Sequence, residues 1–187
     1  MNIPNTLTLL RIALIPIFVL VFYLPYPGMH VLSAVLFGFA ALTDLLDGYL
    51  ARKLGQISRF GEFLDPVADK LMVAVVLVLL VQSDPRAWLA IPAAVIIGRE
   101  IAISALREWM AELGQRTQVA VVAVGKVKTL VQMLALFLML YSEPVGVFPT
   151  YIVGVTLLYV AAVLTLWSML IYIKVALPII FKRENDS

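Results

Sequence analysis

Six long apolar segments, separated by short stretches of turn-forming or charged residues, make up most of this chain. Each comes close to the roughly 20 residues that an α-helix needs to cross the hydrocarbon core of a bilayer. Only 14% of the 187 residues are charged, whereas a typical soluble domain has about 25%. We therefore expect an all-α integral membrane protein with six transmembrane helices, folded as one domain over residues 1–187. The expected helices cover about 5–24, 30–52, 61–82, 87–111, 118–141 and 149–174.

Positive charge is distributed unevenly among the connections between these segments. The connections around 25–28, 83–85 and 142–146 contain turn-forming residues and almost no charge. The other two connections and the C-terminal tail are rich in Lys and Arg, and of the fourteen basic residues only Arg86 falls on the weakly charged side. Since positively charged connections stay on the cytoplasmic side of a membrane, we expect both termini and the connection after residue 52 to be cytoplasmic.

Four aspartates flank that cytoplasmic connection. Asp44 and Asp47 are three residues apart near the end of the second expected helix. Asp65 and Asp69 are four residues apart at the start of the third. Residues three or four apart share one face of a helix, so each pair points in one direction. We call these four residues the acid cluster.

Ionisable groups at a membrane boundary are costly and tend to mark function. Carboxylates that lie close together repel one another unless a cation is bound among them. Oxygen ligands without His or Cys favour Mg²⁺ or Mn²⁺, with Ca²⁺ as a competitor, and four carboxylates can hold two such ions. The alternative is a set of interfacial helix caps, which accounts for one or two of the acids but not for four. Their basic partners would then be Arg52, Lys53, Arg59 and Lys70.

Small residues accompany the acid cluster and would let a ligand or a neighbouring backbone come close. Gly48 follows Asp47 directly, and Gly61 lies one turn before Asp65. The whole pattern resembles the signature of the CDP-alcohol phosphotransferase family, with every position present. It reads Asp44-x2-Asp47-Gly48-x2-Ala51-Arg52-x8-Gly61-x3-Asp65-x3-Asp69.

This resemblance implies a six-helix membrane enzyme with the CDP-alcohol phosphotransferase fold, acting as a homodimer. Its pocket would open to the cytoplasm and the inner leaflet. The resemblance also implies that the acid cluster, Asp44, Asp47, Asp65 and Asp69, holds Mg²⁺ or Mn²⁺, and that Asp69 serves as general base. The residues implied in binding the CDP-lipid are Asn5, Thr8, Asp47, Gly48, Ala51, Arg52 and Gly61.

Further stretches resemble one bacterial branch of the family, namely 5–11, 99–107 with 125–128, and 161–169. That branch transfers the phosphatidyl group of CDP-diacylglycerol to sn-glycerol 3-phosphate and releases CMP, a step of phospholipid biosynthesis in the bacterial cytoplasmic (inner) membrane. The implied partners are therefore these two substrates and membrane lipids, and no nucleic acid is expected. No covalent phosphatidyl-enzyme intermediate is expected, because the motif contains no obvious activated nucleophile.

Basic residues in the fourth and fifth segments suit an anionic acceptor. Arg99 and Arg107 are eight residues apart, so both project from one face of a helix. Arg99 lies near the middle of its expected helix, too far from the lipid headgroups to contact them. Because a phosphate accepts forked hydrogen bonds from arginine, we expect Arg99 to bind the acceptor phosphate. Arg107 and Lys126 could instead contact lipid headgroups, and the residue types alone do not decide between the two roles. The family resemblance favours binding of the acceptor phosphate. Other basic residues, Arg116 and Lys128, are expected to contact the headgroup layer.

Two more embedded charges require partners. Arg11 lies about one turn inside the first segment, after Asn5 and Thr6, which can cap that helix. We expect its guanidinium to reach back to lipid headgroups, and the alternative is that it faces a polar cavity. Glu100 is expected to pair with a neighbouring cation.

Two other functions stay open from sequence. Within the family, the acceptor could be phosphatidylglycerol (cardiolipin synthesis), serine or inositol phosphate. The basic residues argue against serine, and only the likeness along the whole chain favours glycerol 3-phosphate. From a different class, the chain could be a divalent-cation transporter. Transporter sites usually lie near the bilayer midplane, whereas these acids cluster at one end beside basic residues that would repel a permeating cation.

Overall fold

The computed structural model describes residues 3–54, 59–112 and 122–184, and within these ranges the chain forms six α-helices and no strand. The expected all-α membrane architecture with six helices is confirmed. The helices are α1 (Ile3–Tyr23), α2 (Met29–Leu54), α3 (Arg59–Ser83), α4 (Ala87–Glu112), α5 (Val122–Tyr141) and α6 (Thr150–Glu184).

The helix boundaries agree with the expected segments to within a few residues, with one exception. The last expected segment, 149–174, agrees with the apolar membrane-span candidate Thr150–Lys174, but the helix α6 itself continues beyond it to Glu184. Lys174 suggested a membrane boundary, but lysine is a good helix former and its long side chain lets a helix run on into a polar layer. The predicted start of the fifth helix at 118 lies outside the described residues, which resume at Val122.

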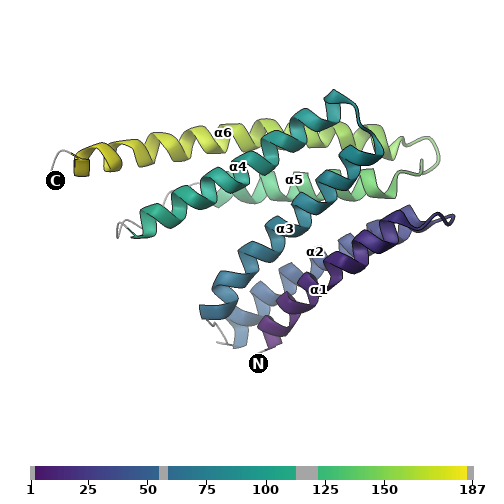
Figure 1. Ribbon diagram of the computed structural model, residues 1–187, viewed down its shortest axis with the longest axis horizontal. Coiled ribbons are helices and arrows are strands. Elements are labelled where there is room, and N and C mark those ends of the chain that lie inside the picture. Colours follow the sequence, from purple (N-terminus) through teal and green to yellow (C-terminus); the bar gives the residue numbers. More distant parts are fainter. Residues whose placement is uncertain (1–2, 55–58, 113–121, 185–187) are drawn as a thin grey trace.

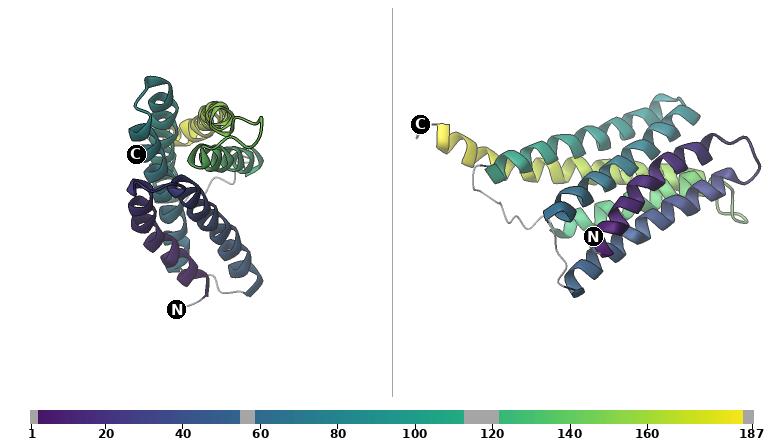
Figure 2. Two further views of the ribbon diagram at one scale, coloured as in Figure 1. Left: turned by 90° about the vertical axis from the view of Figure 1, so that its right-hand side faces the viewer. Right: turned by 60° about the horizontal axis from the view of Figure 1, so that its bottom comes forward.

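The helices form two groups of three (Figure 1). In the first group α1 packs against α2 and α3, and in the second α6 packs against α5 and α4. Contacts of α2 with α5 and of α3 with α4 join the two groups. Figure 2 shows the same arrangement from two further directions. Side chains of both groups can therefore face a common space.

The short turns gather at one end of the helices, on the right of Figure 1, and the chain termini lie toward the opposite end. Polar contacts tie the turns together. Arg86 donates hydrogen bonds of 2.5 and 2.7 Å to the carboxylate of Asp84, and the hydroxyl of Tyr151 donates another at 2.7 Å. The bonds from Arg86 hold the pKa of Asp84 below its usual value. His30 and Glu143 form a further contact of 2.7 Å between turns.

Every helix contributes a buried apolar side chain to one core, for example Phe18, Phe37, Leu77, Ile96, Leu136 and Leu158. Many large apolar side chains nevertheless stay exposed on the outer faces, as expected where lipid replaces water. Within the described residues, three helical stretches are long and apolar enough to cross a membrane: Asn5–Tyr23, Ala87–Ala111 and Thr150–Lys174. Two shorter apolar stretches are Met29–Asp44 and Val127–Tyr141.

Helix α6 comes close to α5 at Gly154. A Cβ atom built on Gly154 would lie 2.6 Å from Cγ of Met139 and 3.0 Å from the backbone oxygen of Ala135. The side chain of Met139 could move, but the backbone of α5 cannot move without disturbing the core. Small residues allow close helix packing of this kind in membranes.

We predict that Gly154→Ala separates α5 from α6 and lowers the free energy of unfolding by about 1–3 kcal/mol, the usual cost of overpacking. Unfolding of the detergent-solubilised protein, followed by circular dichroism, measures this change. Gly98→Ala on α4 is the matched control, because a Cβ built there has no heavy atom within 4 Å apart from its chain neighbours and the backbone of its own helix. Equal stability of the two variants would contradict the close packing at Gly154.

Candidate active site

A buried arginine holds two members of the acid cluster together. Arg11 of α1 is only 1% exposed. Its Nη1 atom forms an ion pair of 2.9 Å with Oδ1 of Asp44 on α2, and a second ion pair with Oδ1 of Asp69 on α3. Because both carboxylates meet the same nitrogen, side chains from three helices converge at one point.

A third acid also faces α1. The hydroxyl of the fully buried Thr8 donates a hydrogen bond of 2.6 Å to Oδ1 of Asp65. Thr8 and Arg11 are three residues apart on α1, and Asp65 and Asp69 are four apart on α3, so two facing helix surfaces meet through these polar pairs. Gly61 is buried one turn before Asp65 on α3.

The remaining predicted residues of this region lie in helices, but their side chains are outside the part of the chain that the structure describes. They are Asp47, Gly48, Ala51 and Arg52 of α2 and Lys126 of α5. Among the described side chains, no three His, Cys, Asp or Glu residues group closely enough to hold a metal ion. Asp47 is not among the described side chains, so the metal site formed by four carboxylates stays a prediction.

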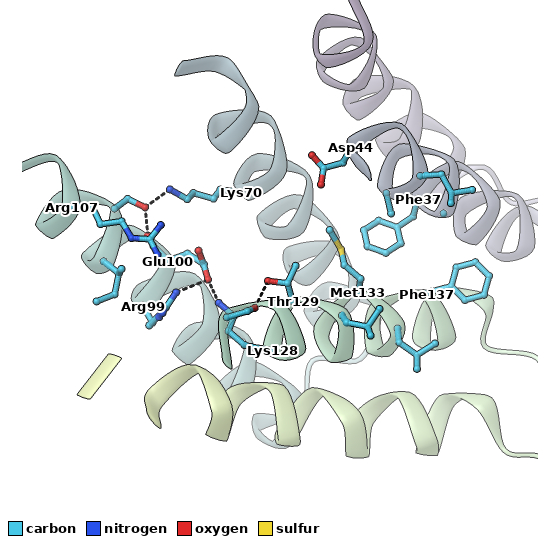
Figure 3. Close-up of a pocket in the computed structure, with 18 of the residues that line it drawn as sticks. Phe37, Asp44, Lys70, Arg99, Glu100, Arg107, Lys128, Thr129, Met133 and Phe137 are labelled. Atoms are coloured by element: carbon cyan, nitrogen blue, oxygen red, sulfur yellow. Dashed lines mark hydrogen bonds and ion pairs between the residues drawn. The ribbon is translucent and has the colours of Figure 1, made fainter. Parts of the chain in front are cut away.

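A cavity of about 1060 Å³ lies between the two groups of helices (Figure 3). Its lining changes from apolar to polar along its length, and Asp44 of the acid cluster also lines it. The apolar end includes Phe37, Met133 and Phe137, and Leu42, Leu130 and Leu134 also line the cavity. The polar end consists of Lys70, Arg99, Glu100, Ser104, Arg107, Lys128 and Tyr172.

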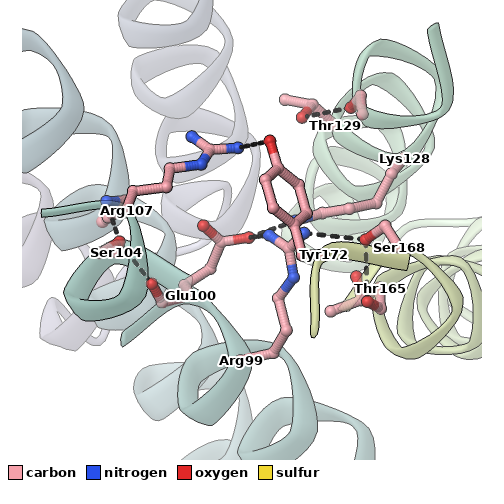
Figure 4. Close-up of polar contacts among 11 residues, drawn as sticks. Arg99, Glu100, Ser104, Arg107, Lys128, Thr129, Thr165, Ser168 and Tyr172 are labelled. Carbon is pink, nitrogen blue, oxygen red and sulfur yellow. Dashed lines mark hydrogen bonds and ion pairs between the residues drawn. The ribbon is translucent and has the colours of Figure 1, made fainter. Parts of the chain in front are cut away.

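One carboxylate organises the polar end. Oε1 of Glu100 accepts a hydrogen bond of 3.1 Å from Nη1 of Arg99 and another from Nζ of Lys128 (Figure 4). Nη2 of Arg99 donates to the hydroxyl of Ser168 on α6 at 2.8 Å. The prediction that Glu100 pairs with a neighbouring cation is confirmed. The two cations are thereby fixed beside each other although they come from different helices.

Two further cations face the same space. Nζ of Lys70 donates to the hydroxyl of Ser104, which in turn donates to the backbone oxygen of Glu100 at 2.5 Å. Arg107 donates to the hydroxyl of Tyr172 at 2.7 Å, and its guanidinium lies 4.9 Å from the centre of the tyrosine ring. This concentration of positive charge is suited to binding an anion. We call the four cations the basic wall: Lys70, Arg99, Arg107 and Lys128.

Two predictions about embedded cations are wrong. Arg11 does not reach the headgroups but is buried against Asp44 and Asp69. Lys128 is only 5% exposed and pairs with Glu100 instead of contacting the headgroup layer. In both cases an acid from another helix neutralises the cation, and no local spacing in the sequence identifies that acid. The other residue assigned to headgroups, Arg116, lies outside the described residues.

Sequence reasoning did not predict the contacts that Ser168 and Tyr172 of α6 make with Arg99 and Arg107. A signal was present, because these residues are four apart and Thr165 precedes Ser168 by three. Polar side chains at that spacing form a stripe on one face of an otherwise apolar helix.

This geometry defines a class of protein. The cavity joins an apolar end to the basic wall, with carboxylates at its border, inside an apolar helical bundle. Such a site suits a membrane enzyme whose substrate carries both apolar chains and anionic groups.

Comparison with known proteins gives the family. A family model described as CDP-alcohol phosphatidyltransferase matches residues 1–167. The chain therefore belongs to the CDP-alcohol phosphatidyltransferase family, as its aspartate pattern predicted.

Several relatives are similar over nearly their whole length. The chain is 57% identical to a protein of Pectobacterium atrosepticum over 178 residues, covering 94% of each chain. It is 57% identical to a protein of Pseudomonas fluorescens over 179 residues, 95% of this chain and 91% of the relative. A relative from Salmonella typhimurium is 54% identical over 175 residues, 94% of each chain. Each of these relatives is named CDP-diacylglycerol–glycerol-3-phosphate 3-phosphatidyltransferase.

We predict that Lys128→Met lowers the free energy of unfolding by about 1–3 kcal/mol, since it removes a charge-assisted hydrogen bond from a partly buried carboxylate. Adding Glu100→Gln should restore part of the loss, because the remaining amide is neutral. A double-mutant cycle of unfolding in detergent measures the coupling. Strictly additive effects would contradict the pairing of Glu100 with Lys128.

Proposed function

We propose that this protein transfers the phosphatidyl group of CDP-diacylglycerol to sn-glycerol 3-phosphate, giving phosphatidylglycerol phosphate and CMP. One observation carries the proposal: a single cavity joins an apolar end, a member of the acid cluster and the basic wall. The names of the relatives indicate the two substrates, and the cavity offers a chemically suitable region for each.

The basic wall supports a phosphorylated acceptor. Glu100 keeps Arg99 and Lys128 beside each other, so an incoming phosphate meets donors that are already positioned. Arginine supplies forked hydrogen bonds and lysine a point charge, which together suit a phosphate dianion. We assign the acceptor phosphate to Arg99, Arg107 and Lys126. Lys70 and Lys128 line the same cavity as Arg99 and Arg107.

The apolar end of the cavity supports a lipid donor. Leu42 and Leu130 line the cavity and are 60% and 71% exposed. In this proposal the acyl chains lie along such apolar side chains while the headgroup reaches the acids. By the family's motif, the CDP moiety is assigned to Asn5, Thr8, Asp47, Gly48, Ala51, Arg52 and Gly61.

Asp69 is the proposed general base. A hydroxyl oxygen of glycerol 3-phosphate attacks the phosphorus that carries the diacylglycerol. The bond from that phosphorus to the oxygen of CMP breaks, and CMP leaves with the electron pair. The proton of the hydroxyl passes to the carboxylate of Asp69. This carboxylate is about one-third exposed and lies next to Asp44, which lines the cavity.

We further propose that the acid cluster, Asp44, Asp47, Asp65 and Asp69, holds Mg²⁺ or Mn²⁺, with two ions in total. The donor set fits these ions, because carboxylate oxygens are their preferred ligands and Asp44 and Asp69 already converge on a cationic nitrogen. When bound, such ions neutralise the pyrophosphate of the nucleotide lipid and make its phosphorus more electrophilic.

The uneven distribution of basic residues supports a membrane orientation with both termini and the acid cluster on the cytoplasmic side. The chain contains no Cys, so single cysteines introduced at Gly146 and at Lys182 can be labelled from either side of sealed vesicles. Labelling of both from the same side would refute this orientation. We also propose a homodimer, which the mass of the detergent-solubilised protein tests.

An assay of the purified protein with CDP-diacylglycerol and Mg²⁺ or Mn²⁺ tests the reaction. We predict CMP release with sn-glycerol 3-phosphate, and none above background with phosphatidylglycerol, serine or inositol phosphate. A faster reaction with another acceptor would overturn the assignment. Asp69→Asn is the control for chemistry: it should abolish turnover and leave the helical content unchanged. Ordinary turnover by this variant would exclude Asp69 as the base.

We predict that Arg107→Gln raises the KM for sn-glycerol 3-phosphate about 10- to 100-fold, the effect of losing a charge-assisted hydrogen bond of about 1.5–3 kcal/mol. The KM for CDP-diacylglycerol should stay within about twofold, because the basic wall does not hold the lipid. Arg86→Gln removes the same kind of charge from a turn at the far end of the helices and should change neither constant. An equal rise for both substrates would contradict a specific role in acceptor binding.

A further inference from the structure

The position of Arg11 has a consequence for the proposed metal site. Its Nη1 atom contacts Oδ1 of Asp44 and Oδ1 of Asp69, and both residues are proposed metal ligands. The Arg11 side chain is 2% exposed, whereas the carboxylates of Asp44 and Asp69 are 30% and 34% exposed. The arginine therefore approaches the acids from the protein interior, and about a third of each aspartate side chain remains exposed.

Two effects of Arg11 on a metal ion oppose each other. By holding Asp44 and Asp69 side by side, the guanidinium orders the ligands, which favours binding. By placing a positive charge on the same oxygens, it repels the ion and withdraws the negative charge that attracts it. The repulsion scales with the double charge of the ion and acts at close range, because both carboxylates contact the same arginine nitrogen. The repulsive effect therefore outweighs the ordering effect.

We propose that Arg11 is a built-in counter-cation that stabilises the empty acid cluster and weakens its hold on divalent ions. This inference rests on the proposed metal site and adds a regulation of that site. The ion then binds tightly only when a further negative charge arrives, and the pyrophosphate of the nucleotide lipid supplies that charge. Arg11 is in this sense a positioning residue that couples metal binding to nucleotide binding.

The experiment measures Mn²⁺ binding by electron paramagnetic resonance, without turnover, on wild type and on Arg11→Met. Methionine keeps much of the length of the side chain and removes its charge. Without nucleotide, the variant should bind Mn²⁺ at least about tenfold more tightly, the effect of removing an opposite charge from neighbouring carboxylates. Addition of CDP should strengthen Mn²⁺ binding in wild type by a larger factor than in the variant.

Thermal unfolding gives a second measurement. Without metal, Arg11→Met should melt at a lower temperature than wild type, because Asp44 and Asp69 then repel each other without a cation between them. Added Mn²⁺ should raise the melting temperature of the variant by more than that of wild type. Arg11→Gln, which also removes the charge, should behave in the same way. A variant that can be purified only with Mn²⁺ present supports the proposal equally.

Three results would overturn it. If wild type binds Mn²⁺ and Arg11→Met binds it equally or more weakly, the counter-cation role is wrong while the metal site stands. If both uncharged variants unfold with and without Mn²⁺, Arg11 is a fixed structural tie and not an exchangeable cation. If neither protein binds Mn²⁺ with or without CDP, the proposed metal site itself fails, and this inference fails with it. Arg86→Met, at the far end of the helices, is the matched control and should leave Mn²⁺ binding unchanged.

Discussion

A positive charge buried among membrane helices must be neutralised by the residues around it, because no water is present to solvate it. Arg11 meets this requirement with Asp44 of α2 and Asp69 of α3. The same requirement works in reverse for the acids, which cannot share a small space without a cation. The pairing therefore fixes how α1, α2 and α3 lie relative to one another at the end of the bundle where the proposed chemistry takes place. The carboxylates that stabilise the packing of these helices through Arg11 are thus also candidate residues of the reaction site.

In the second group of helices, buried charges are neutralised in a similar way around Glu100. Its carboxylate lies between Arg99 and Lys128, and the three side chains stabilise one another inside the bundle. Positive charge still predominates in this wall, so an anion would complete it. Because α2 and α3 pack against α5 and α4, the basic wall and Asp44 of the acid cluster face one cavity. A lipid and a small phosphorylated molecule could thus meet without the lipid leaving the membrane.

Much of this arrangement could be predicted from the sequence, and the rest depended on partners that are far apart in the chain. Apolar length and turn residues gave the helices, and spacings of three and four gave the shared face of Asp65 and Asp69. The same reasoning failed for Arg11 and Lys128, which were expected at the headgroups. A lone cation in an apolar helix can reach outward or pair inward. The outcome depends on whether another helix places an acidic side chain next to the cation. The local sequence around the cation does not contain that information.

The sequence by itself determined the six-helix membrane architecture, the family and the positions of the acids near the end of α2 and the start of α3. These follow from apolar length and from residue spacing along single helices, which are local properties of the chain. Only the tertiary structure decided that Arg11 neutralises Asp44 and Asp69, that Glu100 joins Arg99 to Lys128, and that Asp44 borders the same cavity as Glu100 and its two cations. The physical reason is that a buried charge selects its partner by proximity in space, and proximity between helices arises only when they pack.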